Sequence, residues 1–151
     1  MIERADAVAC AVSYVKTPYV LGGRVKGAGV DCASLIACYL TETGLATVGE
    51  LGLYTSDWFL HSSSEKYLLN LMRHAPKTIE AIARGTVDAK PGSIVLFKVA
   101  NSRLYNHGGI ITKWPMMVHA CDPCVKESNL TSHPMTGFRQ MAIFDPWERT
   151  C

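Results

Sequence analysis

The chain has 151 residues, of which 48% are hydrophobic and 19% charged, and its net charge is +2. This length fits a single domain, and the composition is that of an ordinary globular protein. The Lys and Arg residues are too scattered to indicate a nucleic-acid partner, and no apolar run is long enough to cross a bilayer.

The first predicted element is an amphipathic helix over residues 2–15. Its apolar stripe consists of Ala5, Val8, Ala9, Val12 and Val15. The N-terminus, Met1–Asp6, lacks the basic and apolar segments of a secretory signal, so we expect synthesis in the cytoplasm. We also expect the six cysteines to be reduced.

Cys32 is the most informative residue of the chain. A glycine-rich segment that includes Gly22 and Gly23 leads into it, and a run of helical spacing leaves it and ends near Thr43 and Gly44. A thiol at a helix N-terminus is activated by the helix dipole and the free amide hydrogens, which favour the thiolate. The alternative interpretation is a buried structural cysteine.

Residues 45–90 are predicted to be a helical insertion, with helices at 57–61, 65–73 and 78–84. After Pro91 the pattern changes to short β-branched or apolar runs separated by turn residues. Strands are predicted at 93–99, 108–112, 116–120 and 138–144. Helices followed by strands favour an α+β fold, in which N-terminal helices pack on a C-terminal antiparallel sheet.

Two of the five histidines flank predicted strands and are candidates to serve the thiol. If 108–112 and 116–120 pair through a three-residue connection, Gly109 faces His119, and His107 lies diagonal to it on the same face. His107 would then be the general base, and His119 would orient its ring. The alternative for His119 is a core histidine bonded to a backbone carbonyl. His61, His74 and His133 are predicted to be surface residues.

Five blocks of sequence together resemble the NlpC-type cell-wall peptidases, which are papain-like cysteine peptidases. Their order, the Asp-Cys step and the spacing of 12 between His107 and His119 all resemble that family. The blocks are Pro18–Gly23, Asp31–Leu35, Pro91–Phe97, His107–Ile111 and Val118–Ala120.

The resemblance implies hydrolysis of peptide bonds in peptidoglycan stem peptides, commonly the bond from γ-D-glutamate to the diamino acid. It implies that Cys32 is the nucleophile, His107 the base and His119 the orienting residue, with the Tyr19 hydroxyl nearby. Asp31, Ser34 and Trp58 are the candidate substrate-binding residues. The sequence departs from the family where Ala33-Ser34 replaces the common Ser-Gly, which puts a substrate contact by Ser34 in doubt. No cofactor is expected.

The residues Asp57-Trp58 and 65–68 also resemble phage and prophage members of the family. This similarity and the missing signal predict a tail-associated protein that acts on the cell wall, with phage tail proteins as partners.

Two other functions remain open. The first is a zinc site formed by His119, Cys121 and Cys124, with His133 as a fourth ligand, although structural zinc usually uses two ligand pairs. The second is a module of the same fold that binds the wall without hydrolysis, or an acyltransferase that uses the same thiol.

Overall fold

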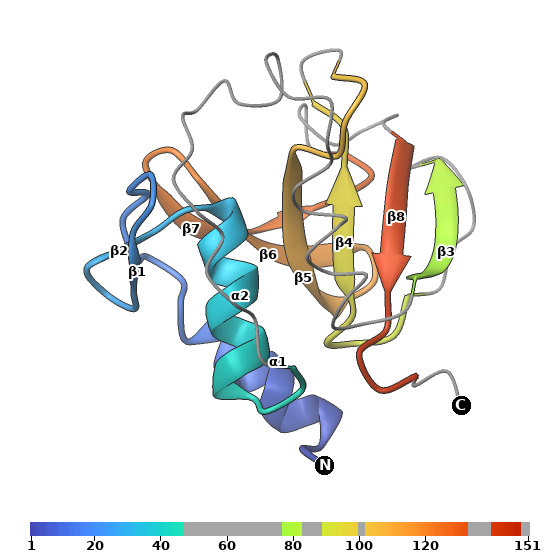
Figure 1. Ribbon diagram of the computed structural model, residues 1–151, viewed down its shortest axis with the longest axis horizontal. Coiled ribbons are helices and arrows are strands. Elements are labelled where there is room, and N and C mark those ends of the chain that lie inside the picture. Colours follow the sequence, from blue (N-terminus) through green and yellow to red (C-terminus); the bar gives the residue numbers. More distant parts are fainter. Residues whose placement is uncertain (47–76, 83–88, 100–101, 133–139, 149–151) are drawn as a thin grey trace.

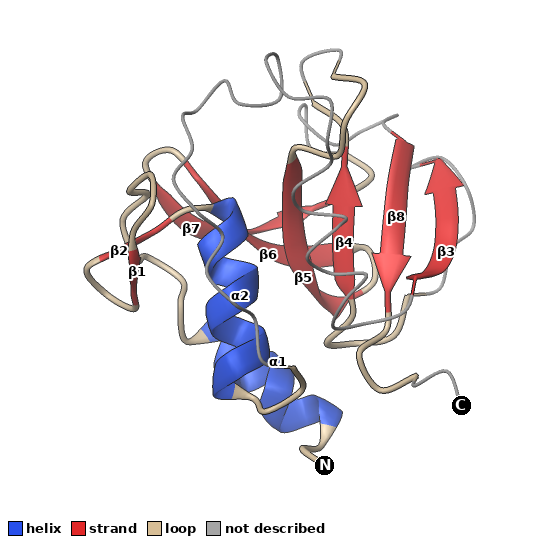
Figure 2. Ribbon diagram, in the orientation of Figure 1, coloured by secondary structure: helices blue, strands red, loops and turns tan. Residues whose placement is uncertain are grey.

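The computed structural model describes residues 1–46, 77–82, 89–99, 102–132 and 140–148. Within these residues two helices precede most of the strands, and six of the strands form one antiparallel sheet in the order β3-β8-β4-β5-β6-β7. The predicted α+β fold is therefore confirmed (Figures 1 and 2). No helix in this part of the chain is long and apolar enough to span a bilayer. The elements are α1 (Arg4–Val12), β1 (Arg24–Val25), β2 (Gly29–Val30), α2 (Cys32–Glu42), β3 (Lys77–Ile82), β4 (Ile94–Phe97), β5 (His107–Lys113), β6 (Met116–Cys121), β7 (Cys124–Asn129) and β8 (Gln140–Phe144).

The sheet is apolar on both faces at its centre. In β4, Ile94 and Leu96 belong to the cluster that packs with the helices, whereas Val95 and Phe97 belong to a second cluster on the other face. All four side chains are fully buried, as expected for a central strand with period-two alternation. Both helices lie beside β5, and α2 also contacts β6 (Figure 1).

The predicted apolar stripe of the first helix is wrong in its position. Three of its five residues are exposed, Val12 among them, and the buried positions are Ala7, Ala11 and Tyr14. A helix rich in Ala and Val offers more than one plausible stripe, so tertiary contacts decide which face is buried. Here Tyr14 is buried, and its hydroxyl donates to Glu42 Oε2 of α2 at 2.8 Å, which fixes the rotation of α1.

The helix predicted near 78–84 is also wrong, because residues 77–82 form strand β3 at the edge of the sheet. β3 pairs with β8, and this pairing satisfies backbone groups that a short isolated helix would satisfy less well. The local helix preference of Glu80 and Ala81 is overridden by this long-range pairing. The other two helices predicted in 45–90 lie outside the described residues.

The β5–β6 hairpin has the predicted register with a different turn. Ile110 pairs with Val118 and Ile111 with Met117, as expected, but Lys113 then pairs with Met116 across an irregularity in β5. The connection is thus two residues long, and the extra residue in β5 keeps the register that a three-residue connection would have given. Because of this extra residue, His107 and His119 lie on the same face of the sheet, as predicted.

Two elements were not predicted. β7 follows β6 after a two-residue turn and forms the last strand of the sheet. The glycine-rich segment before Cys32 folds back on itself as the ribbon β1–β2. Both elements become important because they lie next to the residues of the site.

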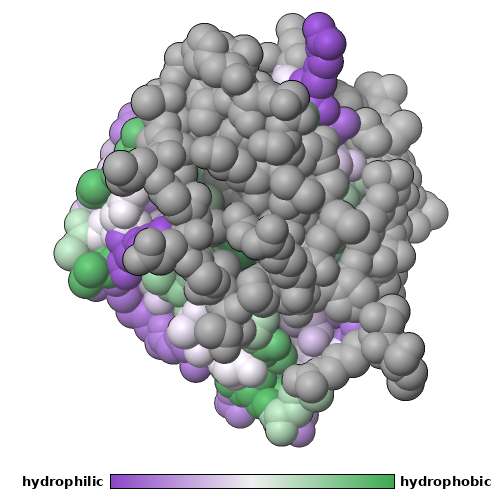
Figure 3. Space-filling view, viewed as in Figure 1, coloured by the Kyte–Doolittle hydropathy of each residue, from purple (hydrophilic) through white to green (hydrophobic). Residues whose placement is uncertain are grey.

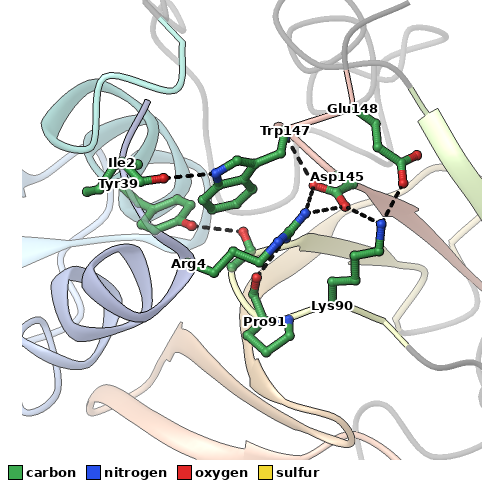
Figure 4. Close-up of polar contacts among 9 residues, drawn as sticks. Ile2, Arg4, Tyr39, Lys90, Pro91, Asp145, Trp147 and Glu148 are labelled. Carbon is green, nitrogen blue, oxygen red and sulfur yellow. Dashed lines mark hydrogen bonds and ion pairs between the residues drawn. The ribbon is translucent and has the colours of Figure 1, made fainter.

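A polar cluster joins the two ends of the described chain (Figure 4). The Arg4 guanidinium donates to both carboxylate oxygens of Asp145, at 2.9 and 2.7 Å, and to the carbonyl of Pro91 at 2.9 Å. Asp145 Oδ1 also accepts from the backbone amide of Trp147, whose indole donates to the carbonyl of Ile2. Asp145 is 3% exposed, so its charge is satisfied almost entirely by protein groups.

Replacing Asp145 by alanine should lower the free energy of unfolding by about 2–4 kcal/mol, because it leaves the half-buried Arg4 without its bidentate partner. Denaturant unfolding followed by far-UV circular dichroism measures the change. The matched control is Glu148→Ala, whose side chain pairs with Lys90 at the surface and should matter far less. Equal losses in the two variants would show that the buried cluster does not stabilise the fold as described.

Candidate active site

Cys32 is the first residue of α2, as predicted, and Asp31 is its N-cap. Asp31 Oδ1 accepts from the backbone amides of Ala33 at 3.0 Å and Ser34 at 2.8 Å, and Ser34 Oγ accepts from the amide of Asp31 at 2.9 Å. This reciprocal pair is a capping box, which holds the helix start in one conformation. The thiol therefore has a fixed position at the N-terminal end of α2, where the helix dipole favours the thiolate.

The glycine segment is anchored to the same carboxylate. Asp31 Oδ2 accepts from the amide of Gly22 at 2.7 Å, and Gly22 has a φ of 75°, which favours glycine. A Cβ on Gly23 would lie 2.6 Å from the carbonyl oxygen of Gly29. The glycines therefore allow a tight bend, and one buried carboxylate ties this loop to the helix.

The imidazole rings of His107 and His119 are hydrogen-bonded to each other. His107 Nε2 lies 2.9 Å from His119 Nδ1, and the rings meet edge to face with centroids 5.2 Å apart. Both side chains are buried, at 6% and 0% exposure. A Cβ on Gly109 would lie 3.1 Å from the Cβ of His119, so Gly109 leaves room for this ring on the neighbouring strand. The predicted diagonal arrangement is confirmed.

The position of His107 is fixed from two sides. Its ring packs against Phe97, with centroids 4.9 Å apart. The preceding residue, Asn106, closes the connection from β4: its side chain accepts from the amide of Val99 at 2.8 Å and donates to the carbonyl of Val99 at 3.2 Å. These contacts hold the imidazole of His107 in place at the first residue of β5.

Sequence reasoning missed Ser128 as a partner of the histidine pair. His119 Nε2 lies 2.9 Å from Ser128 Oγ, and Ser128 is 8% exposed. Cys121 Sγ is a more distant neighbour, 3.9 Å from the same nitrogen. The signal that could have found Ser128 is the alternation of β7, but that strand was not predicted.

Tyr19 lies close to both halves of the site. Burial, followed by the charges of Cys32 and Asp31 and then of Cys121 and Asp122, raises the pKa of Tyr19 to about 12. The hydroxyl therefore stays protonated at neutral pH and can donate a hydrogen bond. The backbone amide of Tyr19 donates to the carbonyl of Pro123 at 2.9 Å, so Tyr19 also contacts the turn after the strand that carries His119.

The start of β5 and the start of α2 lie at the same end of the molecule (Figure 1). Gly108, the second residue of β5, faces α2: a Cβ there would lie 2.9 Å from Ile36 Cδ1, one helical turn after Cys32. A larger residue would also crowd Leu96 Cδ2 and the carbonyl oxygen of Val95, at 2.6 and 2.9 Å from its Cβ, and so would disturb the packing between the strand and the helix. The missing side chain at 108 thus allows the helix that carries the thiol to pack against the strand that carries His107.

The structure describes only some of the residues that were predicted to bind substrate. Asp31 and Ser34 are each 1% exposed and use their polar atoms to cap α2, so their contact with substrate stays a prediction. Trp58 lies outside the described residues. Val20, Leu21 and Val25, which follow Tyr19, are exposed, and Figure 3 shows apolar surface at the edge of the molecule where β1 and β2 lie.

The residues of the possible zinc site lie on the β6–β7 hairpin, where Cys121 and Cys124 are register partners. His119 directs one ring nitrogen to His107 and the other to Ser128. Among the described residues no group of three or more His, Cys, Asp or Glu side chains is arranged to hold a metal ion. His133, the fourth candidate ligand, lies outside those residues.

No protein-family model and no curated protein sequence matches this chain significantly. Solved structures do. The NlpC/p60 domain of the peptidoglycan hydrolase SagA is 21% identical over 94% of this chain and 98% of that chain, with a TM-score of 0.57. NlpC2 from Trichomonas vaginalis is 15% identical with a TM-score of 0.65, over 97% of this chain and 47% of that one. An N-acetylmuramoyl-L-alanine amidase from Bacteroides uniformis is 14% identical over 94% of this chain and 98% of that chain, with a TM-score of 0.58.

At these identities the likeness shows the fold alone. The chain has the papain-like α+β fold of NlpC/p60 domains, as the sequence resemblance predicted. It spans about half of the Trichomonas protein and nearly all of the SagA domain. The phage or prophage subgroup stays a prediction.

Proposed function

We propose that this protein is a cysteine peptidase that hydrolyses peptide bonds in peptidoglycan stem peptides, at the bond between γ-D-glutamate and the diamino acid. The observation that carries the proposal is the buried His107–His119 pair, whose ring nitrogens lie 2.9 Å apart. In the same fold α2 begins at Cys32 and is capped by Asp31. Its support from known proteins is the similarity to NlpC/p60 domains, one of them from a peptidoglycan hydrolase.

The proposal requires the His107 imidazole to meet the Cys32 thiol. Gly108 faces α2, and strand alternation turns the ring of His107 toward Phe97. His107 is the first residue of β5, and in the proposal its ring meets the start of α2 at this end of the strand. His107 Nε2 is engaged with His119, which leaves Nδ1 as the nitrogen that would face the sulfur.

In the proposed reaction the Cys32 thiol gives its proton to His107, and the thiolate attacks the scissile carbonyl. The backbone amide of Cys32 and the Tyr19 hydroxyl donate to the tetrahedral oxyanion. His107 then protonates the departing amine, and a thioester forms on Cys32. Water, deprotonated by His107, hydrolyses the thioester and restores the thiol.

Digestion of purified peptidoglycan sacculi, with products identified by mass spectrometry, tests this function. We expect a new amine terminus at the diamino acid and a free γ-carboxyl on D-glutamate. Products cut at the muramoyl–L-alanine amide would instead assign the activity named for the Bacteroides neighbours. No new termini would contradict hydrolysis and favour a binding module or an acyltransferase.

Replacing Tyr19 by phenylalanine should lower kcat roughly tenfold to a hundredfold while changing KM little, because only the donor to the oxyanion is lost. The aromatic ring remains and preserves the packing. Steady-state kinetics on a defined muropeptide measures both constants. A rise in KM at unchanged kcat would show that the hydroxyl binds substrate and does not stabilise the oxyanion.

We also propose that the protein acts on the wall as a tail-associated protein of a phage or prophage. The support is the resemblance of Asp57-Trp58 and 65–68 to such proteins, in a segment outside the described residues. Immunodetection of the protein in purified virions tests this proposal, and its absence from virions that infect normally would contradict it.

A further inference from the structure

We propose that Ser128 is a positioning residue that fixes the tautomer of His119 and thereby keeps His107 ready to accept the thiol proton. The inference rests on the proposed function and adds a fourth residue to the set of Cys32, His107 and His119. No part of the sequence resemblance assigns a role to this serine, which lies on the unpredicted strand β7.

The three side chains form one diagonal line across three strands. The β5–β6 register places Gly109 opposite His119, and His107 is two residues before Gly109 on the same face. The β6–β7 register pairs His119 with Lys126, and Ser128 is two residues after Lys126 on the same face. Each step is therefore the diagonal contact of an antiparallel pair, which long side chains can bridge. The 2.9 Å distances on both sides of His119 follow from this geometry.

The direction of the protons follows from the chemistry of the step. When His107 holds the thiol proton it is an imidazolium, so its Nε2–H must donate to His119 Nδ1. Nδ1 of His119 can accept only if the single proton of that neutral ring sits on Nε2. Nε2–H then needs an acceptor in a fully buried place, and Ser128 Oγ is at hydrogen-bond distance. Ser128 Oγ can accept from this Nε2–H and thereby support the tautomer that stabilises the charged form of His107.

Cys121 is the competing partner, because its sulfur also lies near His119 Nε2. The distance is 3.9 Å, against 2.9 Å for the serine oxygen, and sulfur is the weaker acceptor. Burial raises the pKa of the Cys121 thiol, with Lys126 acting against that rise, so the sulfur is largely uncharged at neutral pH. His107, Ser128 and Cys121 thus contact the His119 ring, and Lys126 is its register partner on β7.

The experiment compares Ser128→Ala, Ser128→Thr and Cys121→Ala by nitrogen-15 NMR of the histidine rings and by steady-state kinetics. In the wild type, His119 should carry its proton on Nε2. Ser128→Ala should give a mixed tautomer and a roughly tenfold lower kcat at unchanged KM. Ser128→Thr should restore both readouts, because threonine keeps the hydroxyl, and Cys121→Ala should leave both unchanged.

Three results would overturn the proposal. They are a wild-type His119 protonated on Nδ1, a Ser128→Ala protein with wild-type tautomer and kcat, and a Cys121→Ala protein that reproduces the serine variant. The NMR readout does not depend on activity. If the wild type hydrolyses no peptidoglycan, the proposed peptidase function is refuted. The histidine spectra then still support or overturn the tautomer of His119.

Discussion

Cys32→Ala should abolish the release of new amine termini from peptidoglycan, with a loss of at least about a thousandfold, because the thioester of the proposed reaction forms on the Cys32 sulfur. The fold should remain intact. Asp31 caps α2 through the backbone amides of Ala33 and Ser34, and these bonds do not involve the Cys32 side chain. Product analysis by mass spectrometry measures the activity, and thermal unfolding measures the stability.

Cys38→Ala is the matched control for this variant. Cys38 lies on the same helix, is half-buried, and contacts the carbonyl of Arg24 through its sulfur at 3.6 Å. Burial raises the pKa of its thiol, which makes it a poor nucleophile. Full activity in Cys38→Ala and none in Cys32→Ala is the expected pattern. Undiminished hydrolysis by Cys32→Ala would refute the nucleophile assignment.

Asp31→Ala should lower both stability and activity, because one carboxylate holds the helix start and the glycine loop together. It accepts from three backbone amides, at 2.7, 2.8 and 3.0 Å, and is 1% exposed. Loss of an N-cap together with loss of the hydrogen bond from the Gly22 amide to the buried carboxylate should cost about 2–4 kcal/mol. The position of the thiol becomes less fixed, so kcat should fall as well. Denaturant unfolding and kinetics measure the two effects.

Two milder substitutions separate the parts of this effect. Asp31→Asn keeps an oxygen that can cap α2 but offers Gly22 an amide donor, so its loss of stability should be intermediate. Ser34→Ala removes the bonds of Ser34 Oγ with the backbone of Asp31, from its amide at 2.9 Å and to its carbonyl at 3.3 Å, and should cost about 1 kcal/mol. If Asp31→Ala were as stable as the wild type, the capping account of the helix start would be wrong.

The parts of the site that the sequence predicted correctly depend on short-range rules. The helix start at Cys32 follows from the glycine-rich approach and the unbroken apolar run, and Gly44, with a φ of 69°, follows the helix end as predicted. The His107–His119 contact depends only on strand period and register. Its prediction assumed the wrong turn length, and the irregularity in β5 compensated for that error.

The incorrect and missing predictions depend on long-range contacts that local patterns do not encode. The buried face of α1 is set by Tyr14 reaching Glu42, and β3 is a strand because it pairs with β8. β7 was missed because its polar sequence, with Lys126, Glu127 and Ser128, has little strand character by itself. Ser128 was missed with it, since its role appears only when β7 is paired with β6.

The most direct test of the central claim is the rate of iodoacetamide alkylation at each cysteine at about pH 6, in the wild type and in His107→Ala. Burial raises the pKa of the thiols of Cys10, Cys38 and Cys121, so these residues should react slowly and serve as internal references. We expect selective and rapid labelling of Cys32 in the wild type, and much slower labelling of Cys32 when the His107 imidazole is removed. Equal rates at Cys32 in the two proteins would contradict the claim that the imidazole lies beside the thiol and accepts its proton.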